Sequence, residues 1–244
     1  MSPETTASPP SLQLEQVRLC REGRTVLSAL TGSFLPGTLT AVIGPNGAGK
    51  STLLEALAGE LAPSEGRIVR APGLRLGYLP QATRLDRQFP LQVQEVVALG
   101  LWPHIGPWGG LDGRARQRVD QALTEVGLAG LGQRPLQTLS TGQFQRMLFA
   151  RLLAQEAQLL LLDEPFAAMD ERTTVELLGL LQRWQAQGRT VVAVLHDLTQ
   201  VREHFSHTLL LGGAQPVWST TAAALQPAAL IQAGYASAQE ARCA

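Results

Sequence analysis

The sequence predicts an α/β fold built around a mostly parallel β-sheet. Short apolar runs alternate along the chain with segments of helical period, which is typical of α/β architecture. Residues 159–163 and 190–195 are apolar at nearly every position, as expected for strands that are covered on both faces. Residues 39–43 form a third apolar run, which a glycine-rich segment separates from a helical pattern. We therefore expect these runs to be strands of one sheet that helices cover.

The other elements follow from periodicity and from residues that end helices. A helix after the glycine-rich segment should end at Gly59, since glycine readily adopts the backbone conformation that closes a helix. Residues 74–78 alternate as in a half-buried strand. A further helix is expected near residues 175–187, just before Gly188, and residues 209–211 should form a shorter strand.

The chain divides into a lead-in and one domain. Residues 1–11 are rich in Pro, Ser and Thr, so we expect a disordered lead-in before a single domain over residues 12–244. Residues 86–144 contain several prolines and two helical patterns, which predicts a mostly helical subdomain inserted into the core. Residues 219–244 are rich in alanine and are expected to form a partly helical tail.

Charge and hydropathy limit the classes of partner. The chain has 20 Lys and Arg and 20 Asp and Glu, so its net charge is zero and we expect no nucleic-acid partner. The aliphatic runs are short, such as the four leucines of residues 159–162, and no run approaches the roughly 20 apolar residues that a membrane helix needs. Any membrane association is therefore expected to go through another protein or a surface contact.

Residues 44–51 read GPNGAGKS, which is the phosphate-binding pattern G-x-x-x-x-G-K-S between a strand and a helix. The glycines let successive backbone N–H groups point at phosphate oxygens, and the helix N-terminus adds partial positive charge. Lys50 should reach the β- and γ-phosphates, and the Ser51 hydroxyl should bind Mg²⁺. A glycine-rich turn without a ligand is the competing interpretation. The expected nucleotide-binding residues are Gly44, Pro45, Asn46, Gly47, Ala48, Gly49, Lys50, Ser51 and Thr52.

Two acidic residues end the apolar run at residues 159–163. Because ligands of parallel sheets bind at the carboxyl ends of strands, Asp163 fits the carboxylate on the Mg²⁺ side of a nucleotide hydrolase. Glu164 points elsewhere and is the candidate to polarise an attacking water molecule. A solvated acidic turn is the alternative interpretation.

Residues 139–146 read LSTGQFQR and stand shortly before this strand. This segment resembles the signature LSGGQ-x-QR of ABC-type ATPases. Gln81, Asp170 and His196 then resemble the Q-loop, D-loop and switch residues of that family, in the family's order. Each match is weak by itself, but together they are specific. The resemblance covers roughly residues 12–218 and identifies the chain as a member of the ABC ATP-binding subunits.

The resemblance implies a fold and a mechanism. The fold is a P-loop NTPase core of the RecA-like type with a mostly parallel sheet, an antiparallel β lobe and an inserted helical subdomain. Two copies face each other head to tail, and each ATP lies between the phosphate loop of one and the signature of the other. The resemblance implies catalytic roles for Lys50, Gln81, Glu164 and His196. It implies that Ser51, Gln81 and Asp163 contact the Mg²⁺ bound with ATP. The residues implied to contact ATP across the dimer are Leu139, Ser140, Thr141, Gly142 and Gln143, and Asp170 is implied to have the D-loop role.

Two positions depart from the family pattern. Thr141 replaces the first glycine of the signature, and we expect a side chain near the phosphate and a costly positive φ there. The aromatic residue that packs on adenine falls, by spacing, near Arg21, where no Tyr or Phe is present. Arg21 either stacks its planar guanidinium on adenine or is an exposed charge.

A finer resemblance concerns the transported substrate. Residues 86–93 read DRQFPLQV, and residues 96–100 read VVALG, which is similar to the ATPases of zinc and manganese importers. The resemblance then implies integral-membrane permease subunits, an indirect link to a substrate-binding protein, and a peripheral location on the cytoplasmic face of the inner membrane. The alternatives are the ATPase of a haem, siderophore or cobalamin importer and a regulatory or exporter ATPase of low turnover. His204 and His207 are two potential metal ligands without a third.

Overall fold

The computed structural model describes residues 11–81, 87–102, 106, 110, 112–167, 169–213 and 215–235. The start of the expected lead-in, Asp86 of the importer-like motif and the end of the alanine-rich tail lie outside the described residues. Among the described residues, no helix combines the length and the apolar character needed to cross a membrane.

The larger of two sheets contains six strands among the described residues, in the order β5-β6-β7-β3-β8-β9. The first five run parallel, and β9 pairs antiparallel at one edge. The mostly parallel sheet predicted from the apolar runs is thus confirmed. The strands are β3 (Leu39–Ile43), β5 (Leu76–Leu79), β6 (Leu159–Asp163), β7 (Thr190–Val194), β8 (His207–Leu210) and β9 (Val217–Thr220).

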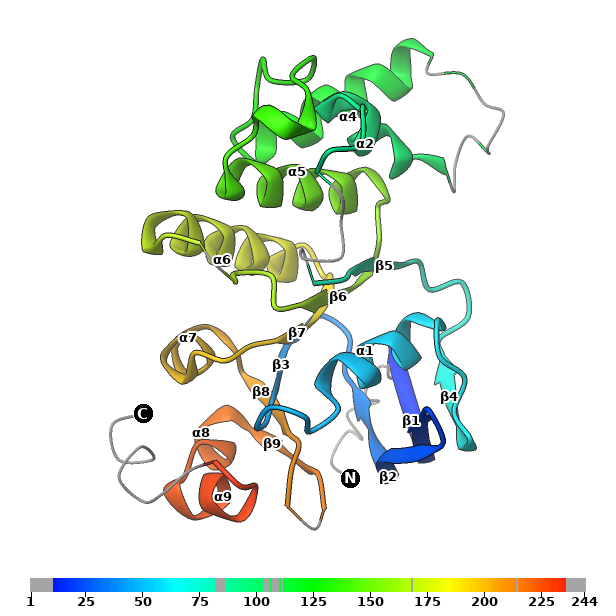
Figure 1. Cartoon of the computed structure of the whole chain (residues 1–244), viewed down its shortest axis with the longest axis vertical. Coiled ribbons are helices and arrows are strands. Elements are labelled where there is room, and N and C mark those ends of the chain that lie inside the picture. Colours follow the sequence, from blue (N-terminus) through cyan, green and yellow to red (C-terminus); the bar gives the residue numbers. More distant parts are fainter. Residues whose placement is uncertain are drawn as a thin grey trace, which may run out of the picture.

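The smaller sheet is the expected antiparallel lobe. It consists of β1 (Leu12–Arg21) between β2 (Arg24–Phe34) and β4 (Glu65–Arg70). It lies on the side of the large sheet where β8 and β9 are found (Figure 1). The backbone of β2 approaches Trp218 of β9 so closely that a Cβ on Gly32 would lie 2.3 Å from the indole. The Trp218 ring also packs edge-on against Phe34, with ring centroids 4.9 Å apart.

Helices pack on the large sheet, and three of them form a group at one end of the molecule. Helices α2, α4 and α5 form a separate group at the end of the molecule away from the small sheet, while α1 lies between the two sheets (Figure 1). This group corresponds to the expected helical subdomain. Its last helix, α5, ends at Ala154, beyond the expected end at residue 144. The helices are α1 (Lys50–Ala58), α2 (Val93–Leu99), α4 (Gly113–Glu125), α5 (Thr141–Ala154), α6 (Glu171–Ala186), α7 (Leu198–His204), α8 (Thr221–Ala224) and α9 (Pro227–Gln232).

The strand β6 separates two hydrophobic cores. Leu160 and Leu162 belong to the core beneath the helical subdomain, whereas Leu159 and Leu161 belong to the core shared with α1 and the small sheet. All four side chains are fully buried. Burial on both faces explains why this strand is apolar at every position before its terminal carboxylate.

Candidate functional site

The phosphate loop follows β3 at the carboxyl end of the large sheet. Gly47 and Gly49 adopt φ angles of 82° and 89°, in the left-handed region that glycine tolerates best. A Cβ on Gly49 would also lie 2.7 Å from Cγ1 of Val26 in β2. Gly49 is the N-cap of α1, so the loop leads directly into a helix N-terminus. The loop therefore has the shape expected for a phosphate cradle.

Lys50 is the first residue of α1 and is 7% exposed. Its Nζ donates hydrogen bonds to the carbonyl oxygens of Gly44, at 2.8 Å, and of Pro45, at 3.0 Å. Burial lowers the pKa of Lys50, and the nearby carboxylates of Glu164 and Asp163 oppose that shift by favouring the charged form. The ammonium group thus lies between the loop carbonyls and the acidic strand end.

Ser51, the residue after Lys50, contacts Asp163 at the end of β6. The Ser51 hydroxyl donates to Oδ1 of Asp163 at 3.2 Å, and Asp163 is 1% exposed at the end of β6. A hydroxyl and a carboxylate are the hard oxygen donors that Mg²⁺ prefers. Nowhere in the described part of the chain do three or more His, Cys, Asp or Glu side chains gather as a metal site. The pair therefore fits an ion that takes most of its ligands from a nucleotide and water.

Glu164 lies at the centre of a three-residue contact. Its Oε2 accepts a hydrogen bond from Nε2 of Gln81 at 2.8 Å, and its Oε1 lies 2.7 Å from Nε2 of His196. These residues follow the neighbouring strands β5, β6 and β7, so the order of the sheet brings them together. Glu164 has a φ of 48°, which a non-glycine residue seldom adopts and which is concentrated at functional sites.

The signature segment begins α5. Ser140 is its N-cap: the Ser140 hydroxyl accepts from the Gln143 N–H at 3.2 Å, and Oε1 of Gln143 accepts from the Ser140 N–H at 3.1 Å. Thr141 is the first helical residue and is not among the residues with positive φ. The positive φ expected at Thr141 is therefore wrong, because the position is helical and any L-residue accommodates it. Leu139 is buried beneath the helix start.

The signature and Asp170 share one surface hollow of about 330 Å³, which Ser140, Gly142, Gln143 and Thr173 help to line. Asp170 caps α6: Oδ1 accepts from the Thr173 N–H at 2.8 Å, and Oδ2 accepts from the Thr173 hydroxyl at 3.0 Å. These bonds lower the pKa of Asp170. The phosphate loop is not part of this lining, so the signature and the phosphate loop lie on two separate surfaces of the chain.

Arg21 and Tyr235 contact residues of the phosphate loop or of the helix that follows it. Nη1 of Arg21 lies 3.1 Å from Oε2 of Glu55 on α1, so the guanidinium has an acidic partner within the chain. Adenine stacking by Arg21 stays a prediction. The hydroxyl of Tyr235 accepts a hydrogen bond from the Gly44 N–H at 2.7 Å. Sequence reasoning missed Tyr235, because a single tyrosine in an alanine-rich tail carries no local signal.

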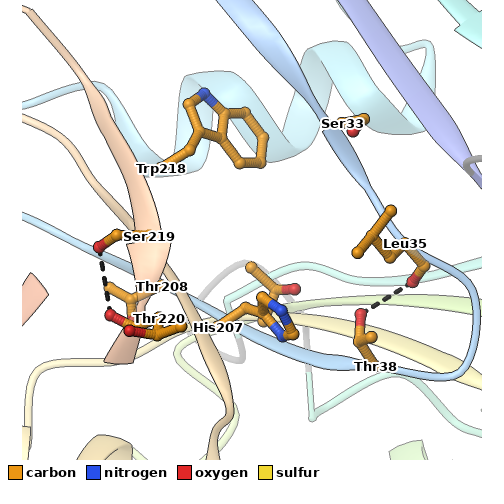
Figure 2. A pocket seen from close by; sticks show the side chains of 9 residues that line it. Ser33, Leu35, Thr38, His207, Thr208, Trp218, Ser219 and Thr220 are labelled. Carbon is orange, nitrogen blue, oxygen red and sulfur yellow. Dashed lines mark hydrogen bonds between the residues drawn. The ribbon is translucent and has the colours of Figure 1, made fainter. Parts of the chain in front are cut away.

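A second hollow lies at the opposite end of the sheet. It has a volume of about 250 Å³ and is lined by β2, β3, β8 and β9, with Trp218 on one wall and His207 on the other (Figure 2). His207 and His204 have different partners, Ser206 and Gln182, so the two histidines do not form a pair. This hollow lies at the amino ends of β3 and β8, away from the phosphate loop.

A parallel sheet with a glycine-rich phosphate loop, a Ser51–Asp163 pair and a glutamate at the next position defines a P-loop nucleotide hydrolase. The family model described as ABC transporter matches residues 27–167. The chain therefore belongs to the ABC transporter ATP-binding family and is an ATPase.

Relatives and solved structures agree with this assignment. The chain is 37% identical to a zinc transport system ATP-binding protein of Treponema pallidum, over 85% of this chain and 80% of the relative. It is also 37% identical to a manganese transport system ATP-binding protein of Synechocystis, over 77% and 75% of the two chains. A solved ABC transporter described as being of the metal-chelate type, in an inward-facing conformation, matches with a TM-score of 0.84 and 31% identity, covering 92% of this chain and 89% of that one.

Proposed function

We propose that this ATPase powers a membrane importer of a divalent metal ion, zinc or manganese. The names of relatives at 37% identity support this cargo, as does the importer-like segment around Phe89 and Val93. The observation that carries the catalytic part of the proposal is the contact of Glu164 with both Gln81 and His196 at the carboxyl edge of the sheet.

The chain's own residues then divide the work of ATP hydrolysis. The N–H groups of the phosphate loop hold the phosphate oxygens, and Lys50 leaves its carbonyl partners to bind the β- and γ-phosphates. Glu164 orients the attacking water and accepts its proton. His196 holds the γ-phosphate and the water, and Gln81 links the bound nucleotide to the helical subdomain.

Mg²⁺ bound with ATP would neutralise charge that develops on the phosphates. Ser51 and Asp163 would hold the ion through their adjacent oxygens, and the side-chain oxygen of Gln81 would complete the protein's share. Pro45, Asn46, Ala48 and Thr52 belong to the same nucleotide surface by their position in the loop and the first turn of α1.

The surface formed by the signature and Asp170 would bind a second copy of the chain. Ser140 and the N–H groups near Gly142 sit at the N-terminus of α5, where the partial positive charge of a helix favours a phosphate. In a head-to-tail dimer this surface would cover the ATP on the partner's phosphate loop. ATP then favours the closed dimer because it contacts both halves only there.

The membrane partners would be integral-membrane permease subunits, which this chain would bind at the cytoplasmic face of the inner membrane, and through them a substrate-binding protein. Phe89 is 58% exposed and Trp102 is 53% exposed on either side of α2. Phe89 belongs to the importer-like segment, residues 86–93, that we expect to contact the permease. Its exposure supports docking of this segment on the permease.

The test is purification of the chain with its native permease, followed by ATPase assays in liposomes. Stimulation by a zinc- or manganese-loaded binding protein supports the proposal, and the E164Q variant serves as the inactive control. The metal-chelate description of the solved relative favours one second candidate, an importer of a metal chelate. Stimulation only by haem, a siderophore or cobalamin would select that candidate and overturn the free-metal cargo.

A further inference from the structure

The carboxyl-terminal segment contacts the first residue of the phosphate loop. The Gly44 N–H donates to the Tyr235 hydroxyl at 2.7 Å, across 191 residues of sequence. The tyrosine is partly buried and packs against the core beneath the helical layer. Burial raises the pKa of Tyr235, and the hydrogen bond from the Gly44 N–H opposes this shift.

The segment reaches Gly44 by a close backbone fit. A Cβ on Gly212 would lie 2.2 Å from the Ala233 carbonyl oxygen, and one on Gly213 would lie 2.4 Å from that of Gln232. Leu230 and Ala233 anchor the segment, being 1% and 4% exposed. The chain after β8 and the end of α9 therefore pass in contact, which leaves little freedom in where Tyr235 lies.

Both backbone polar groups of Gly44 consequently have a hydrogen-bond partner. Its N–H is bound by Tyr235, while its carbonyl oxygen accepts from Nζ of Lys50 at 2.8 Å. Because glycine has no Cβ to restrict rotation, these contacts fix the direction in which the loop leaves β3. A loop that is ordered before the ligand arrives loses less conformational entropy on binding.

We propose that Tyr235 is a positioning residue for the phosphate loop, and that its hydroxyl raises the affinity of the chain for adenine nucleotides by holding Gly44. The inference rests on nucleotide binding at residues 44–51, which is part of the proposed function. Tyr235 acts through the backbone of Gly44 and not on the phosphates themselves. It contributes equally to the binding of ATP and ADP, since the contact lies at the loop entrance.

The experiment compares wild type with Y235F, which removes only the hydroxyl oxygen. Direct titration with MgATP and MgADP should show dissociation constants raised about three- to tenfold, the loss expected for one buried hydrogen bond. Backbone hydrogen exchange at Gly44 should become faster. The matched control is I231A, because Ile231 lies on α9 but is 48% exposed, and it should change neither quantity.

Nucleotide affinities of Y235F equal to those of wild type would overturn the inference. So would a lower midpoint of urea unfolding with unchanged Gly44 exchange, because the tyrosine would then stabilise the fold without positioning the loop. If wild type itself bound no nucleotide, the proposed function would fail instead, so the two failures are distinguishable. The titration needs no permease and is independent of the cargo.

Discussion

The Nε2 atom of His196 lies 2.7 Å from Oε1 of Glu164, and this contact joins the ends of two adjacent parallel strands. With an ionised carboxylate, the imidazole must carry its proton on Nε2 to donate this bond. The side chain of Glu164 is 21% exposed and that of His196 is 49% exposed, so both can be reached from solvent. A water molecule can therefore approach the pair from solvent.

Substitution of Glu164 by Gln should abolish hydrolysis while leaving ATP binding intact. Glutamine keeps the size of the side chain but cannot accept a proton, so turnover should fall by about a hundredfold or more. Phosphate release measures the first effect. Size-exclusion chromatography with MgATP should reveal a trapped dimer. Hydrolysis by E164Q at the wild-type rate would refute the role of general base.

Replacement of Lys50 by Ala should weaken ATP binding itself. The substitution removes a buried cation that has charge-assisted contacts, so the dissociation constant should rise about ten- to a hundredfold. Titration with a fluorescent ATP analogue measures it. R67A is the matched control, since the Arg67 side chain is 72% exposed on β4. Equal losses in both variants would point to net charge instead of a specific phosphate contact.

Replacement of Thr141 by Gly, which restores the family pattern, should not relieve any strain. Thr141 is helical, and glycine is the poorer helix former, so the variant should be less stable by about 0.5 kcal/mol or less. Urea unfolding measures this difference. A clear gain in stability would mean that the threonine is strained after all.

The cap of α6 should make stability depend on pH in a defined window. Hydrogen bonds from Thr173 lower the pKa of Asp170 in the folded chain below its ordinary value of 3.8. The carboxylate therefore contributes stability that is present above about pH 3.8 and is lost as the pH falls through the folded-state pKa. Wild type should thus exceed D170N in stability at pH 7, and this margin should shrink near pH 3.

Unfolding curves at both pH values test the cap. The variant E171Q is the control, because it removes a neighbouring acidic charge in the first turn of α6 but not the cap. A margin between wild type and D170N that stayed constant down to pH 3 would contradict the argument.

The strands around the site could be predicted closely from sequence. Residues 39–43 and 159–163 are apolar at all but one position each because both faces are buried, and the structure gives β3 and β6 these bounds. The helix α6 begins at Glu171, four residues before the first predicted position, because Asp170 caps it there. The apolar pattern thus predicts the ends of buried strands well, whereas it misses a helix start that a polar capping residue sets.

Contacts between distant residues could not be predicted in the same way. The meeting of Gln81, Glu164 and His196 depends on the order of three strands, which no local pattern encodes. The ion pair of Arg21 with Glu55 and the bond from Gly44 to Tyr235 likewise join separate elements. Thr141 was misjudged because a family pattern carries residue types but not backbone angles.

The two cores on either side of β6 have a mechanical consequence. Residues 159–162 are all leucine, so it is Asp163 that sets the register of β6: a slip by one residue would move this carboxylate into the place of Leu162, inside a hydrophobic core. Asp163 and Glu164 are therefore fixed in the frame of the sheet. We therefore expect ATP-driven movement of the helical subdomain to take place relative to these two carboxylates.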